Sequence, residues 1–192
     1  MAEQPLAEPN IIISPETKGE LIIDPRTVAQ TMQELGISKQ GIRNTSILVD
    51  ETNRIATNGI AYPRWLGILR HLHHPQLRDA PGPIIRLSSV VKGKERSAED
   101  MNRTLVHELE HVAQMERKDP NIKLGHIAIW GLAAAGGIAV NRLMRGRSKV
   151  IRSTATFAGA AMGQQLGYRI APHEIEARQR AKEISTSAIK RF

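Results

Sequence analysis

The hydrophobic residues of this chain follow a helical period first and an extended pattern afterwards. Val28, Met32 and Leu35 recur at helical spacing between Asp24-Pro25 and Gly36, which predicts a helix over residues 24–35. Runs of apolar and β-branched residues bounded by polar, Pro or Gly breaks then predict three strands. These strands are residues 46–49, 58–62 and 84–91, and a short helix is expected at 65–71.

A second helix is predicted after Ser97, a good N-cap that Glu99 and Asp100 follow in the first turn. An apolar stripe at helical spacing runs along it: Met101, Leu105, Leu109 and Val112. The element ends at Asp119-Pro120, because Pro restricts the residue before it and cannot donate a backbone hydrogen bond.

The next part of the chain reads as a helical hairpin, because residues 124–140 and 153–168 carry no formal charge. A basic stretch without an acid separates them: Arg142, Arg145, Arg147, Lys149 and Arg152. Small residues repeat every four positions and predict close helix packing: Gly131, Ala135 and Ala139, then Ala155, Gly159, Gly163 and Gly167. Each segment is near the lower limit for crossing a bilayer, so membrane contact and a soluble packed hairpin both remain open.

Pro172 begins the last predicted helix, which carries an apolar face at helical spacing: Ala177, Ala181, Ile184 and Ala188. With 192 residues, the chain is long enough for one domain that has an insertion. We expect a flexible segment at 1–20, a core at 21–123, a hairpin at 124–170 and a closing helix at 171–192. The mixture of helices and a small sheet predicts the α+β class.

The candidate chemistry lies in the second helix, where the chain reads His107-Glu108-Leu109-Glu110-His111. Three fixed positions of this H-E-x-x-H pattern recur by chance roughly once in a hundred chains of this length. A helix places the two imidazoles one turn apart on one face, where both can bind one Zn²⁺ ion. Glu108 is then the candidate catalytic base, directed at a water that the zinc activates.

A third ligand must come from elsewhere, because Gln114 and Arg117 occupy the positions where one class of zinc enzymes has its Gly and third His. The last helix offers Glu174 and Glu176. Glu174 lies at the edge of the alanine face and Glu176 on the charged face, so Glu174 is preferred and Glu176 kept as the alternative. His173 and Tyr168 are candidate donors to an oxyanion.

These motifs resemble those of zincin metallopeptidases of the Glu-zincin, or gluzincin, type. H-E-x-x-H followed by Glu174-x-x-Ala177, with a hydrophobic hairpin between them, is most similar to membrane zinc proteases of the HtpX and CAAX-prenyl-protease kind. The resemblance implies a small mixed sheet, an active-site helix, a hairpin insertion and a Glu-bearing C-terminal helix. It also implies that residues 84–91 form the edge strand that binds substrate. Arg178 stands where such families often have an Asp that orients a ligand histidine.

The resulting hypothesis is a zinc-dependent metallopeptidase that acts on a peptide or protein substrate. The alternative is a non-enzymatic membrane-associated or scaffold protein with a structural or vestigial metal helix. The net charge is +8, and the basic residues crowd the hairpin turn, but no nucleic-acid motif accompanies them, so no specific nucleic acid is expected. Cysteine is absent, which removes thiol ligands and thiol catalysis. The polar first ten residues do not read as a signal peptide, so a cytoplasmic location, with lipid contact through 124–170, is expected.

Overall fold

The computed structural model describes residues 6–15, 17, 20–51, 59–62, 77, 80–91 and 93–192. The chain divides into a sheet unit, residues 1–117 with 179–192, and a hairpin unit, residues 118–178. Six α-helices occur in the described part, together with small sheets, so the protein has a mixed α/β fold compatible with the α+β class. The predicted helix at 65–71 lies outside the described residues.

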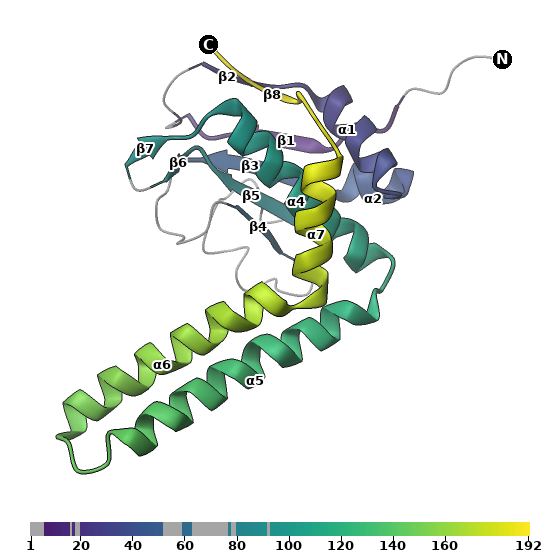
Figure 1. Ribbon diagram of the computed structural model, residues 1–192. Helices are drawn as coiled ribbons and strands as arrows, with labels where there is room; N and C mark the ends of the chain where they lie inside the picture. Colours follow the sequence, from purple (N-terminus) through teal and green to yellow (C-terminus); the bar gives the residue numbers. More distant parts are fainter. Residues whose placement is uncertain are drawn as a thin grey trace. The chain divides into compact units, whose positions relative to one another are not determined.

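The sheet unit is built on a four-stranded mixed sheet in the order β1-β3-β5-β4 (Figure 1). Its strands are β1 (Asn10–Ile13), β3 (Ser46–Asp50), β5 (Ile84–Ser88) and β4 (Gly59–Tyr62). β1, β3 and β5 are parallel, whereas β4 runs antiparallel to β5. β1 falls within the segment that we expected to be loosely ordered, and its pairing with β3 shows why that expectation was wrong for residues 10–13.

The prediction for residues 84–91 was right about extended structure and wrong about its place in the sheet. β5 lies between β3 and β4, and the chain then continues as a separate two-stranded hairpin of β6 (Val90–Val91) and β7 (Lys94–Glu95). Among the described strands, the two edges of this sheet are β1 and β4. Every residue of β5 is buried, as expected for a strand that has a partner on both sides.

In the described part of the chain, two short helices precede the metal-motif helix. α1 (Pro25–Glu34) begins at its N-cap Asp24 and ends before Gly36, whose φ of 77° suits glycine, so the predicted boundaries are confirmed. The carboxylate of Asp24 accepts hydrogen bonds from the Thr27 hydroxyl and the Arg26 amide, which lower its pKa. α2 (Lys39–Asn44) was not predicted. Ser38 caps it, and the Ser38 amide also donates to both carboxylate oxygens of Glu116 at 3.3 Å.

The motif helix α4 (Ala98–Glu116) packs its apolar stripe against the sheet, as the spacing predicted. Met101, Leu105 and Leu109 are fully buried in one core with Ile47 and Leu87 of the strands beneath. Fully burying a side chain of this size contributes about 1.5–3 kcal/mol, so this face fixes how α4 lies on the sheet.

Arg96 joins the end of β5 to the first turns of α4. Its buried guanidinium donates to the Ser88 carbonyl at 3.0 Å, to the carboxylate and carbonyl of Asp100, and to the Thr104 hydroxyl. A buried cation needs this many acceptors to offset its lost hydration.

The C-terminal residues do not continue as helix, which corrects the prediction for 171–192. α7 (Pro172–Glu183) ends at Glu183, and the chain later forms β8 (Ile189–Arg191), antiparallel to β2 (Leu21–Ile23). Asn102 of α4 donates to the Ile189 carbonyl and accepts from the Ile189 amide, at 2.9 and 2.8 Å. This reciprocal pair and the β2–β8 ladder hold the end of the chain on the sheet unit.

The hairpin unit consists of α5 (Pro120–Leu143) and α6 (Lys149–Ile170), followed by the first half of α7. Asp119 and Ser148 cap the two long helices. The small-residue stripe of α6 faces α5 as predicted, and Gly159 and Gly167 are buried there. The stripe predicted for α5 was wrong: Gly131, Ala135 and Ala139 are exposed. The buried positions of α5 are Gly125, Ile129, Ala133 and Gly137.

We predict opposite effects for the same substitution at two helical glycines of the hairpin. A Cβ at Gly163 would lie 2.0 Å from the Leu132 carbonyl oxygen, whereas nothing lies within 4 Å of one at Gly131. Gly131→Ala should stabilise by up to about 1 kcal/mol through helix propensity. Gly163→Ala should destabilise by about 1–3 kcal/mol because the helices must separate. Urea unfolding followed by circular dichroism measures both, and equal stabilisation would contradict this packing.

Candidate metal centre

α4 carries both histidines of the motif on one side, as the spacing predicted. The two rings meet edge to face with centroids 4.7 Å apart, and their Nε2 atoms lie 3.2 Å apart. Two nitrogens bound to one tetrahedral zinc ion at 2.0–2.1 Å lie about 3.3–3.4 Å from each other. His107 and His111 therefore already stand at nearly the separation that a shared metal ion requires.

Within the described residues, one group of side chains has the composition and spacing of a metal site. It consists of His107, His111 and Glu174, whose ligand atoms all lie within 4.8 Å of one another. Glu174 is buried in the first turn of α7, a helix that continues into the sheet unit after Arg178. Glu176 is half-buried and does not belong to this group. Two imidazoles and a carboxylate suit zinc and other divalent transition metals.

Gln114 is a member of this region that the sequence reasoning did not assign. Its side chain is fully buried, and its amide oxygen lies 3.0 Å from Nδ1 of His111. An amide oxygen accepts hydrogen bonds, so this contact suits the His111 tautomer that has its proton on Nδ1, in which the Nε2 lone pair would be open to a metal. Gln114 is three residues after His111 on the same helix, and this spacing was the signal that could have identified it.

The two glutamates inside the motif lie in different surroundings. Glu110 is fully buried and accepts from the guanidinium of Arg117 at 2.6 Å, while Arg117 also donates to the Leu35 carbonyl. This ion pair fastens the end of α4 to the end of α1. Arg117, one of the two positions that excluded the alternative zinc-enzyme pattern, thus has a structural role.

Glu108 is also buried, and it lies close to an edge strand of the sheet. A Cβ at Gly59 of β4 would be 3.1 Å from Oε1 of Glu108 and 2.6 Å from the Thr104 methyl group. A side chain at this position would displace the Thr104 methyl group and crowd the Glu108 carboxylate. The absence of a Cβ at Gly59 therefore brings the backbone of β4 near Glu108, and the sequence alone did not indicate this approach.

In the hairpin unit, two basic side chains lie beside the carboxylate of Glu174. His173 Nε2 is 3.7 Å from Oε1, and the Arg178 guanidinium is 3.7 Å from Oε2. Arg178 also donates to the carbonyl oxygens of Tyr168 and Arg169, at 2.7 and 3.2 Å. Arg178 therefore holds the start of α7 against the end of α6, whereas the side chain in contact with His111 is that of Gln114.

The two candidate oxyanion donors differ in placement. His173 is buried, and its ring lies edge to face on His126 with centroids 5.7 Å apart. It also covers Gly125, where a Cβ would overlap the His173 ring. The Tyr168 side chain is 44% exposed. Neither residue belongs to the metal group.

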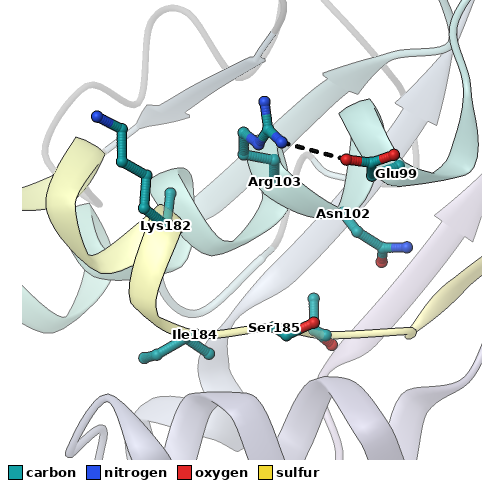
Figure 2. Close-up of a pocket in the computed structure, with 8 residues that line it drawn as sticks. Glu99, Asn102, Arg103, Lys182, Ile184 and Ser185 are labelled. Carbon is teal, nitrogen blue, oxygen red and sulfur yellow. Dashed lines mark hydrogen bonds and ion pairs between the residues drawn. The ribbon is translucent and has the colours of Figure 1, made fainter.

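A cavity of the sheet unit lies away from these side chains. Figure 2 shows it beside the first turns of α4 and the stretch between α7 and β8, where Arg103 is paired with Glu99 at 3.2 Å. Its lining is polar and includes Asn102, Lys182, Ser185 and Thr186. It contains no member of the metal group.

Comparison with known proteins gives no relative for this chain. No protein-family model, no curated protein and no solved structure matches it significantly. The interpretation of the site therefore depends on its geometry and chemistry.

We predict that the two acids of α7 contribute unequally to metal binding. Glu174→Ala should lower the affinity at least 10-fold because a first-sphere oxygen is lost, and Glu176→Ala should leave it nearly unchanged. Titration with zinc in competition with a chromophoric chelator measures both. A larger loss in the Glu176 variant would move the ligand to that residue.

Gln114→Leu should lower metal affinity about 10- to 100-fold, because His111 loses the acceptor that fixes its tautomer and ring orientation. Gln114→Glu, which keeps an acceptor oxygen at nearly the same place, is the matched control and should retain most of the affinity. The same chelator competition measures both variants. Wild-type affinity in the Leu variant would contradict the orienting role.

Proposed function

We propose that this protein is a zinc-dependent metallopeptidase that hydrolyses peptide bonds. The observation that supports the proposal best is the combination of a three-residue metal group with a buried Glu108 inside the same H-E-x-x-H turn. Structural zinc sites in proteins are usually closed by four protein ligands, whereas catalytic sites have three and leave one position open. Among the residues that the structure describes, the donor set has three members, as in the catalytic kind of site.

His107, His111 and Glu174 would hold the metal ion. When bound, zinc lowers the pKa of water toward 7 and polarises a carbonyl group. Gln114 keeps His111 in the tautomer that binds metal through Nε2. The zincin-like arrangement implied by the sequence resemblance is part of this proposal.

Glu108 is the proposed general base and general acid. Its carboxylate accepts a proton from the attacking water and returns it to the amine of the departing peptide. The carbon–oxygen bond to the water forms first and gives an oxyanion, and the carbon–nitrogen bond of the substrate then breaks. The acid product gains the hydroxyl group of the water, and the amine product gains its proton.

The edge strand β4 is the proposed place for the substrate backbone, in place of residues 84–91. β4 pairs with β5 on one side, and Gly59 brings its backbone close to Glu108. An extended peptide can add to such an edge through backbone hydrogen bonds, which recognise chain conformation more than side-chain identity. This supports an unfolded or extended peptide as the substrate class. His173, beside Glu174, is the proposed oxyanion donor in preference to Tyr168.

The alternative is a metal-holding scaffold without turnover. Such a protein would bind zinc through the same three residues and leave an unfolded protein substrate intact. Zinc content together with lack of cleavage would favour this alternative.

Glu108→Gln should retain metal and lose cleavage by at least 100-fold, because the amide cannot accept the proton. Elemental analysis and cleavage of an unfolded protein substrate measure the two properties separately. Glu99→Gln, an exposed position of the same helix, is the control and should cleave like the wild type. Undiminished cleavage by the Glu108 variant would rule out the general-base assignment.

A further inference from the structure

The two long helices of the hairpin unit contact each other through their smallest residues. A Cβ added at Gly159 would lie 2.7 Å from the carbonyl oxygen of Gly136, and one at Gly167 would lie 2.5 Å from the Cα of Ile129. The backbones therefore touch almost directly. Such an interface contributes dispersion and backbone contact but buries little apolar side-chain area.

The large apolar side chains of the same helices point away from this interface. Phe157 is 79% exposed and Met162 is 74% exposed. The other large exposed members of α5 and α6 are Leu124, Ile127, Trp130, Ile138, Leu143, Val150, Ile151, Leu166, Tyr168 and Ile170. In water, hydrophobic burial places large residues inside and small or polar ones outside. This hairpin has the reverse arrangement.

The uncharged surface extends around the hairpin. Residues 124–140 and 153–168 contain no Asp, Glu, Lys or Arg, so no side of either helix offers a charged face to water. A helix that is apolar on all sides is found in a protein core or in a bilayer, and residues 127–140 of α5 are of this kind. The uncharged surface of α6 is less apolar, because Ser153, Thr154, Gln164 and Gln165 are exposed on it. Among the described helices, α5 is long and apolar enough to cross a membrane by length and composition. Only 22% of its most apolar stretch is buried, so it is not a core helix of this chain.

The turn between the helices has the opposite character. Four exposed cations, Arg142, Arg145, Arg147 and Lys149, stand there together with the half-buried Arg152. No acidic residue occurs from Pro120 to His173. This local positive charge selects an anionic partner at the end of the apolar surface.

We propose that the hairpin unit inserts into an anionic phospholipid bilayer, with its outer faces among the acyl chains and its basic turn at the lipid phosphates. A bilayer surrounds an inserted hairpin, whereas a protein partner or nucleic acid would cover one side. Residues 124–140 span about 25 Å as a helix, against about 30 Å for the hydrocarbon core. The helix is therefore shorter than the hydrocarbon core, and the long arginine and lysine side chains of the turn extend over the remaining distance to the phosphates.

The test uses the full chain, reconstituted by detergent removal into phosphatidylcholine vesicles with or without phosphatidylglycerol. The protein should float with the anionic vesicles and remain bound after washes in high salt and alkaline carbonate. If the protein stayed in the soluble fraction with both vesicle types, that result would overturn the proposal. Release by salt alone would also overturn it, because that result indicates surface attraction without insertion.

Matched charge variants test the basic turn. Changing Arg145, Arg147 and Lys149 to Gln should lower partitioning into anionic vesicles roughly 100-fold, at about fivefold for each cation. Changing Lys39, Arg43 and Lys190, three exposed cations of the sheet unit, should leave it nearly unchanged. Equal losses would indicate general electrostatics and contradict a role for the turn.

Single cysteines report insertion directly, since the chain has no native cysteine. An environment-sensitive fluorophore on Met162→Cys should shift to the blue in anionic vesicles, and one on the exposed Ser185→Cys should not. A blue shift at Met162 in lipid-free buffer, with dimers in light scattering, would assign the surface to a second copy of the chain. Tighter binding to duplex DNA than to vesicles would assign the basic turn to nucleic acid. Either outcome would overturn the lipid proposal.

Discussion

The orientation of α4 on the sheet is the constraint on which the candidate metal centre depends. Its buried stripe of Met101, Leu105 and Leu109 allows one rotation of the helix about its own axis. Once that rotation is set, the period of 3.6 residues sends His107 and His111 to the same side, and their Nε2 atoms meet at 3.2 Å. Glu110 is directed to Arg117 by the same rotation, while Glu108 approaches the backbone of β4. A different rotation would expose the core and point both imidazoles in another direction.

The two units of the chain bury opposite kinds of residue. The sheet unit buries branched and long side chains such as Met32, Ile47 and Leu87 in a continuous core, as water-soluble proteins do. The hairpin unit buries Gly137 and Gly159 and exposes Phe157 and Met162. Glycines cost about 1 kcal/mol each in a water-exposed helix, so their place at the helix contact indicates close approach of backbones. The fold therefore combines two kinds of interior within one chain.

Some errors of sequence interpretation have a common physical source. The four-residue spacing of Gly131, Ala135 and Ala139 is the same as that of Gly125, Ile129, Ala133 and Gly137, so spacing cannot say which stripe meets α6. Residues 84–91 were assigned to an edge, because the partners of a strand depend on pairings across long separations. β1 with β3, and β2 with β8, are pairings of this kind. Strand propensity indicates extended structure and carries no information about neighbours.

The sequence by itself determined the local features. It fixed the caps of α1 and α4, the apolar stripe of α4 and the one-turn spacing of His107 and His111, because these depend on residues within one or two helical turns. Tertiary structure decided which distant groups joined them. Glu174 reaches the metal group from more than sixty positions along the chain, and Gly59 lies against Glu108 through sheet pairing. Gln114 became an orienting residue only when its burial fixed its amide beside His111. The helical period relates residues that are close in the sequence. Residues from separate elements come together only when those elements pack against one another.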